Sequence, residues 1–147
     1  MPDSFDCIIV GGGGAGLAAA YSAACQGATV ALLERRPQPG GTTGIAVGSF
    51  TAAGTRWQRR AGIDDNPEDH DEDVSLFADP ELEARNNQPL RRFFLEHAAE
   101  TLHWLQQELR LNYVGPSPEP PNRCPRMHNV VPGAKAYVVR VQLALRR

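Results

Sequence analysis

Apolar residues form two short runs near the start of the chain, separated by a glycine turn and an alanine-rich segment. Residues 5–10 are largely apolar and β-branched and end at four consecutive glycines, which predicts a buried strand rather than an amphipathic helix. Residues 15–26 are rich in alanine and stop before Gly27, which predicts a helix closed by a left-handed glycine. Residues 29–34 are apolar again and predict a second strand. These segments together predict one βαβ unit with parallel strands and a right-handed crossover.

The rest of the chain contains one strongly periodic segment between irregular ones. Residues 37–54 are rich in glycine and threonine and predict an ordered loop with little regular structure. Pro89 precedes residues 90–111, where apolar side chains recur at spacings of three and four and predict an amphipathic helix. Residues 116–132 contain six prolines, which exclude a helix or a central strand there, and residues 136–145 are apolar again. The expected buried face of the long helix consists of Leu90, Phe94, Ala98, Leu102, Leu105 and Leu109.

Two groups of side chains could suggest a metal site, and neither has the required spacing. Residues 64–73 hold seven acidic side chains, but they lack the oxygen-ligand spacing of an EF-hand, so a solvated helix start or loop is the favoured interpretation. The cysteines, Cys7, Cys25 and Cys124, are odd in number and far apart. We therefore predict no metal site, and we interpret the cysteines as buried, inert thiols.

Length and charge exclude several classes of protein. A chain of 147 residues is the size of one ordinary domain. With 15 basic and 17 acidic residues, the net charge of −2 is too small to indicate nucleic acid or an anionic membrane as a partner. The sequence has no apolar run of 18 residues or more, and its start lacks the basic segment and cleavage site of a signal peptide. These features favour a cytoplasmic globular protein without a membrane span.

The glycine turn has the spacing of a dinucleotide-binding loop, Gly11-x-Gly13-x-x-Gly16. In such a loop the first glycine permits the tight turn, the second lets backbone amides approach a pyrophosphate, and the third allows close packing of helix on strand. Glu34 ends the second strand 23 residues after Gly11, where a carboxylate can accept hydrogen bonds from ribose hydroxyls. This acid disfavours NADP, although Arg35 beside it weakens that argument. The pattern predicts a bound dinucleotide and leaves NAD and FAD both open.

A second kind of evidence comes from residues 10–16, 34–43, 48–55, 61–68, 100–111 and 133–136. Through these stretches, nearly the whole chain resembles the FAD-binding domain of the fumarate reductase/succinate dehydrogenase flavoprotein family. This resemblance implies that the amides near Ala15 contact the pyrophosphate, that Glu34 binds the adenosine ribose, and that Thr42 and Thr43 lie beside the flavin. The residues expected to bind FAD are Gly11, Gly13, Gly14, Ala15, Gly16, Glu34, Arg35, Gly41, Thr42, Thr43, Gly48 and Ser49.

The sequence departs from this family at four points. Members that attach the flavin covalently have a histidine near the position of Thr42, whereas the first histidine here is His70, so noncovalent FAD is expected. Ser49 replaces the second glycine of a pair beside the flavin, and Arg110 replaces the glycine after the long helix, at about 1 kcal/mol if that residue must be left-handed. Family members are also far longer than this chain.

The expected fold is α/β: a Rossmann-like βαβ core at residues 5–55, then a helical segment and a proline-rich loop at 56–147. On this view the chain is an incomplete FAD-binding domain of 147 residues. It would be marginally stable, because Ile8, Ile9, Val30 and Leu32 would border an unpaired sheet surface that favours self-association.

The expected function is that of the FAD-binding part of an oxidoreductase. In the family, hydride moves between flavin and a carbon–carbon bond next to a carbonyl or carboxylate, and the small-molecule substrates are dicarboxylates, tricarboxylates or 3-ketosteroids. The alternatives are a truncated, non-catalytic dinucleotide-binding module and an NAD-dependent enzyme, the latter disfavoured by the loop at residues 40–55.

The catalytic residues are unknown, because the family's substrate-binding and proton-delivering groups lie in parts that the resemblance does not cover. His97 and His103 on a helix face, and His128 in the proline-rich loop, are interpreted as structural. Only activity of this chain by itself would direct the search to Arg123, Arg126 and His128.

Overall fold

The computed structural model describes residues 4–146, which form two compact units. The first unit consists of the chain up to Gly48, Leu109–Leu111, and the chain from Val130 onward. The second consists of Ser49–Glu108 and Asn112–Asn129. Each unit is therefore built from segments that are far apart in the sequence, and each is described by itself.

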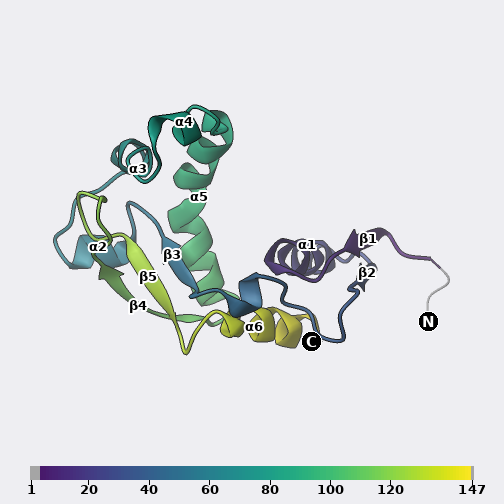
Figure 1. Cartoon of the computed structure of the whole chain (residues 1–147). Coiled ribbons are helices and arrows are strands. Elements are labelled where there is room, and N and C mark those ends of the chain that lie inside the picture. The colour runs from purple at the N-terminus through teal and green to yellow at the C-terminus, as the bar shows by residue number, and fades with distance from the viewer. Residues whose placement is uncertain (1–3, 147) are drawn as a thin grey trace. The chain divides into compact units, whose positions relative to one another are not determined.

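The first unit contains the predicted βαβ arrangement (Figure 1). Strand β1 (Cys7–Val10) pairs in parallel with β2 (Val30–Leu33), with Cys7 opposite Val30, and helix α1 (Gly14–Cys25) connects them. Gly27 follows the helix with a φ of 83°, the left-handed conformation expected for a residue that ends a helix. The α/β fold predicted from the sequence is confirmed.

Two later elements complete the first unit. A 3-10 turn, η1 (Thr43–Ile45), interrupts the glycine-rich loop, and helix α6 (Lys135–Leu145) forms from the last apolar run. Helix α6 packs against α1 and η1 and buries Val138 and Val141. The first unit thus covers one face of α1 with a helix that lies more than a hundred residues away in the chain.

The second unit is a three-stranded sheet with helices. Strand β3 (Ser49–Thr51) runs antiparallel to β5 (Met127–Val131), and the strand order is β3–β5–β4, with β4 at Asn112–Ser117. Figure 1 shows the long helix α5 (Gln88–Gln107) beside this sheet. The core cluster is formed by Ala52, Ala98 and Leu102, with Phe50, Trp57 and Tyr113 packed around it.

Short helices precede α5, and local capping explains where they begin. Helix α2 (Arg56–Arg60) starts after Thr55, whose side chain forms a reciprocal capping box with Gln58. Helices α3 (Pro67–Val74) and α4 (Pro80–Glu83) each begin with proline after a side-chain cap, which suits the first turn because proline lacks the N–H that would be unpaired there. Helix α3 packs against α5.

The buried face of α5 differs from the one expected. Leu90 and Phe94 are 62% and 55% exposed, whereas Leu95, Ala98 and Leu102 are buried. Residues three and four positions before Ala98 lie on nearly the same helix face, so an apolar pattern alone does not distinguish position 94 from position 95. The helix also stops at Gln107, and Arg110 has a φ of 53°. This left-handed arginine confirms the position at which glycine was expected.

The sequence-based exclusion of a central strand from residues 116–132 is wrong. Strand β5 occupies Met127–Val131 and lies between β3 and β4. The six prolines gather at residues 116–125 and at Pro132, so the residues between them keep their backbone N–H groups for sheet pairing. His128 is therefore a buried residue of a central strand and not part of a loop.

The acidic segment and the cysteines are also placed differently from expectation. The side chains of Asp65 and Asp73 are 1% and 3% exposed and pair with Arg126, so this segment is only partly solvated. All three cysteines are free thiols, as expected. They are not fully buried, however: Cys25 is exposed, and Cys7 and Cys124 are half-buried. The local composition did not predict the burial of these side chains, because burial depends on which distant segments pack against them.

Candidate functional site

The glycine loop, the end of β2 and the segment before η1 enclose a pocket of about 390 Å³ in the first unit. Five of the residues predicted to bind a dinucleotide line it: Gly11, Glu34, Arg35, Gly41 and Thr42. The pocket is also lined by four residues that the sequence did not single out, namely Val10, Leu33, Arg36 and Ile45. A volume of this size lies within the range of ligand-binding pockets.

The glycines of the loop have three different structural roles. Gly11 has a φ of 104°, in the region that favours glycine, where the chain turns out of β1. A Cβ at Gly16 would overlap the carbonyl oxygen of Gly11, so only glycine lets α1 approach the strand this closely. At Gly13 a Cβ would meet no protein atom within 4 Å, and the backbone is extended. The protein's own packing therefore does not require glycine at position 13, and the space beside it is free of protein atoms.

The N-terminus of α1 is open to an anion. Its N-cap, Gly13, has no side chain to bond the first turn, and the first turn contains no acidic residue. The Gly14 N–H donates to the Thr43 hydroxyl at 3.2 Å, whereas the amides of Ala15 and Gly16 have no acceptor within the helix. These two N–H groups and the positive end of the helix dipole provide a site for a phosphate group.

Glu34 is held in place at the other side of this loop. Its Oε2 accepts from the Gly12 N–H at 2.8 Å, and its Oε1 accepts from the Arg36 N–H at 2.9 Å. The amide of Arg36, followed by that of Gly12, lowers the pKa of Glu34 below its ordinary value. The carboxylate is therefore ionised at neutral pH, and each oxygen keeps a lone pair that can accept a hydroxyl.

The segment after β2 is attached directly to the glycine loop. Gly40 N–H donates to the Gly12 carbonyl at 2.7 Å, and Gly13 forms an isolated bridge with Gly40. Together with the bond from Gly14 to Thr43, these contacts bring Gly41, Thr42 and Thr43 next to residues 11–16. Hydrogen bonds thus connect residues 12–14 of the glycine loop to residues 40–43.

Gly48 and Ser49 do not line this pocket. The Gly48 carbonyl accepts from the Tyr137 hydroxyl at 3.0 Å, and a Cβ at Gly48 would lie 2.7 Å from the Val130 side chain. Ser49 begins the second unit, where its hydroxyl donates to the Asn129 side chain at 2.7 Å. Their expected contact with the flavin stays a prediction.

The residues overlooked by sequence reasoning contribute in two ways. Gly12 presents the N–H that orients Glu34, and Arg36 contributes both an amide and a place in the pocket wall. The position of Arg36 directly after Glu34 and Arg35 could have indicated that it lines the same pocket. Val10, Leu33 and Ile45 are 84%, 55% and 83% exposed, and nothing in their local pattern distinguishes such wall residues from core residues.

The three residues to which activity of this chain would direct the search for catalytic groups lie in the second unit: Arg123, Arg126 and His128. Arg126 is completely buried and donates to Asp65 and Asp73. Arg123 bonds Asp73 through its backbone amide and its side chain. His128 is 1% exposed and contacts the Thr55 hydroxyl at 3.2 Å. Arg126 and His128 are buried, whereas the Arg123 side chain is 44% exposed and forms ion pairs. His97 and His103 lie on α5.

The described residues contain neither a metal-binding cluster nor a membrane-spanning helix. Between residues 4 and 146, no three or more His, Cys, Asp or Glu side chains come together in an arrangement that could hold a metal ion. No helix within the same range has the length and apolar character needed to cross a membrane.

Comparison with known proteins identifies the family. Residues 6–135 match the family model described as FAD binding domain. The chain is 42% identical over 107 residues to NADH:fumarate oxidoreductase of Klebsiella pneumoniae, an alignment covering 71% of this chain and 11% of that protein. It is 36% identical over 105 residues to fumarate reductase (cytochrome) of Shewanella frigidimarina, covering 70% of this chain and 17% of that protein.

The structure gives the same relationship over almost the full chain. It matches the open conformation of a flavocytochrome c3 fumarate reductase with a TM-score of 0.84 at 26% identity, covering 99% of this chain and 26% of that one. The chain thus spans 11% and 17% of the two curated relatives and about a quarter of the matched structure. By its family match and its fold, the chain belongs to the FAD-binding domain family, within the fumarate reductase-like flavoprotein oxidoreductases.

Proposed function

We propose that this chain binds FAD noncovalently in the pocket between the glycine loop and Glu34. The amides of Ala15 and Gly16 hold the pyrophosphate, and the Glu34 carboxylate accepts hydrogen bonds from the adenosine ribose. Thr42 and Thr43 lie toward the flavin, and Gly48 and Ser49 present their backbone near its reactive edge. The observation that supports this most strongly is the open space above Gly13, beside the N–H groups of the first turn of α1.

The charges around this pocket suit an adenosine diphosphate group. The helix N-terminus is positive, and Arg35 and Arg36 line the pocket beside Glu34. Because Glu34 is ionised and its position is held by two amides, a phosphate on the ribose 2′-oxygen would meet a fixed negative charge. These contacts favour FAD or NAD over NADP, and the family match favours FAD.

The reaction of the whole protein is a further part of the proposal. FAD, when bound, supplies transfer of a hydride to or from a carbon–carbon bond next to a carbonyl or carboxylate. The two curated relatives reported above are named for fumarate, which has such a bond. We assign this class of small-molecule substrate to the protein and leave its catalytic residues unassigned, because the candidates in this chain are engaged in internal contacts.

Self-association and location also belong to the proposal. Among the strand residues expected at an unpaired surface, Ile8 is 61% exposed, whereas Ile9, Val30 and Leu32 are half-buried. Self-association would therefore involve the sheet surface around Ile8. The free thiols are consistent with a cytoplasmic location. The division of the chain into residues 5–55 and 56–147 stays a prediction.

Titration of the purified chain with FAD and with NAD tests the proposed cofactor. We expect quenching of flavin fluorescence and a shifted flavin absorption spectrum, with NAD binding more weakly. Glu34→Gln removes the charge that the ribose hydroxyls would meet and should weaken FAD binding about tenfold, whereas Glu108→Gln at the exposed end of α5 should leave it unchanged.

Tighter binding of NAD than of FAD would overturn the assignment of the cofactor. Equal affinities for FAD in the Glu34→Gln and wild-type chains would overturn the assigned site. If FAD binds as expected but the whole protein reduces no activated alkene, the non-catalytic dinucleotide-binding module becomes the correct interpretation.

A further inference from the structure

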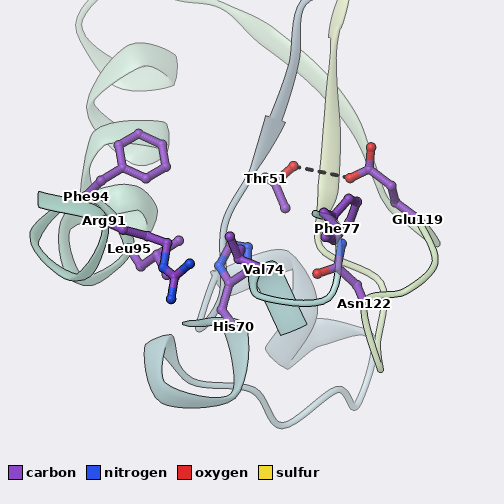
Figure 2. Close-up of a pocket in the computed structure, with 9 residues that line it drawn as sticks. All are labelled: Thr51, His70, Val74, Phe77, Arg91, Phe94, Leu95, Glu119 and Asn122. Carbon is purple, nitrogen blue, oxygen red and sulfur yellow. Dashed lines mark hydrogen bonds between the residues drawn. The ribbon is translucent and has the colours of Figure 1, made fainter. Parts of the chain in front are cut away.

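A separate pocket of about 310 Å³ is formed entirely by residues of the second unit (Figure 2). Its apolar residues come from helices α3 and α5 and from Phe77, three residues after the end of α3. Figure 2 shows Phe94 on one side of this pocket, with Phe77 and Glu119 on the other. The apolar lining residues are Val74, Phe77, Phe94 and Leu95.

The two aromatic rings of the wall are accessible. Phe77 and Phe94 are 51% and 55% exposed, although each contributes to a pocket. Phe94 is placed by its neighbour Phe50, with ring centroids 6.5 Å apart. Aromatic faces that line a partly enclosed space attract apolar groups and cations.

The charged side chains that line the pocket are Arg91 and Glu119. The guanidinium of Arg91 donates to Asp71 at 2.6 Å and to Glu83 at 2.7 Å, so its charge is already balanced by carboxylates outside the pocket lining. Glu119 contacts the Thr51 hydroxyl at 3.5 Å, and within the described part of the chain it forms no ion pair. A carboxylate beside aromatic rings, with no cation of its own, is a suitable site for a positively charged group.

His70 adds no positive charge at neutral pH. Its side chain is buried against the pocket, and burial, followed by the charge of Arg126, lowers its pKa to about 4. Its Nδ1 atom has no hydrogen-bond partner among the described residues. The imidazole is therefore a neutral polar group in the wall, and it adds no cation that could pair with Glu119.

We propose that this pocket binds a small organic cation, an amine or quaternary ammonium with an aromatic or aliphatic body. The apolar body lies between Phe77 and Phe94, and the cationic group is directed toward Glu119. A volume of about 310 Å³ accommodates one ring with a short side chain. The pocket lies within the second unit, so the proposal does not depend on binding of FAD.

Three ligands of similar shape test the sign of the charge: 2-phenylethylamine, 2-phenylethanol and phenylacetate. Binding to the full chain is followed by NMR titration, which also reports which residues shift. We expect the amine to bind most tightly and the carboxylate most weakly, with saturable shifts at the residues of the pocket. Glu119→Gln should weaken binding of the amine about tenfold and leave the alcohol nearly unchanged.

Two further variants distinguish the carboxylate and the aromatic ring of this pocket from other parts of the protein. Glu100→Gln changes an exposed carboxylate of α5 outside the pocket and should leave the affinity for the amine unchanged. Phe77→Leu preserves an apolar side chain but removes an aromatic face, and should weaken the amine more than the alcohol. Equal or tighter binding of the alcohol or the carboxylate, or no saturable binding of the amine, would overturn the proposal.

Discussion

Arg126 and Asp65 form a bidentate ion pair in the interior of the second unit. The Arg126 Nη2 and Nε atoms lie 2.7 Å and 2.8 Å from the two carboxylate oxygens of Asp65, and the side chains are 0% and 1% exposed. Arg126 also donates to Asp73, which in turn accepts from Arg123. This network links the start of β5 to α3 and to the residues just before that helix.

Removal of one partner of this pair should be costly, because the other charge would be left buried. We expect Arg126→Met to lower the free energy of unfolding by about 3 kcal/mol, measured by urea denaturation. Arg123→Met, at a side chain that is 44% exposed, should have a clearly smaller effect, because Asp73 keeps its bond to Arg126. Similar losses in the two variants would contradict the assigned importance of the buried pair.

Burial of His70 should make stability depend on pH. The pKa of His70 falls from 6.5 to about 4 because of burial and, secondarily, the charge of Arg126. Between these values the unfolded chain binds a proton that the folded chain does not, so stability should decrease as pH falls from about 6.5 to about 4. The expected loss is roughly 2 kcal/mol, measured by denaturation across this range.

The variant His70→Gln provides the control for that measurement. It removes one titrating group and should make the stability curve between pH 6.5 and 4 less steep. Burial also lowers the pKa of His128 and of His103, so part of the slope should remain. Although burial raises it, hydrogen bonds from Arg123 and Arg126 lower the pKa of Asp73 to about 2, so this carboxylate titrates only in stronger acid. An unchanged slope in His70→Gln would show that another group is responsible.

Gly13→Val should separate cofactor binding from folding. The new side chain would project into space that no protein atom occupies within 4 Å, and the backbone there is extended, so the fold should tolerate it. The approach of a pyrophosphate to the Ala15 and Gly16 amides would be blocked, and FAD affinity should fall at least about tenfold. Ala24→Val, at an exposed position of the same helix, is the matched control for fluorescence titration.

Attachment of the flavin should be noncovalent. The position at which the resembled family carries its histidyl link is Thr42, which lines the pocket and offers no nitrogen for such a bond. Acid precipitation of the FAD-loaded chain should therefore leave all the flavin in the supernatant. Flavin fluorescence retained by the protein band of a denaturing gel would show that this expectation is wrong.

Arg110→Gly should stabilise the chain slightly. Arg110 has a φ of 53°, a conformation that costs a residue with a Cβ about 1 kcal/mol more than glycine. The backbone oxygens of Leu109 and Arg110 accept from Arg140 at 2.7 Å and 3.0 Å, and these bonds do not need the Arg110 side chain. Part of this gain is offset because glycine has greater conformational freedom in the unfolded chain. Thermal denaturation should therefore show that the free energy of unfolding increases by about 0.5 kcal/mol. Arg110→Val should be destabilising.

The sequence by itself determined the βαβ unit and the elements of its glycine loop. Gly11, Gly16 and Gly27 are required by a turn, a close approach and a helix end, which are local features written in consecutive residues. The left-handed conformation of Arg110 was expected only from the family resemblance, because the apolar pattern by itself extended the helix to residue 111. Short-range sterics govern each of these features, so a short stretch of sequence contains the necessary information.

Only the tertiary structure decided which distant residues meet. Asp65 and Arg126 are separated by 61 residues, and the central position of β5 depends on pairing with β3 and β4. The choice of Leu95 over Phe94 as a buried residue, the burial of His70 and the bond from Gly14 to Thr43 depend in the same way on what packs against each segment. Burial and long-range pairing are properties of the assembled fold, because the energy of each contact depends on all the groups that exclude water from it.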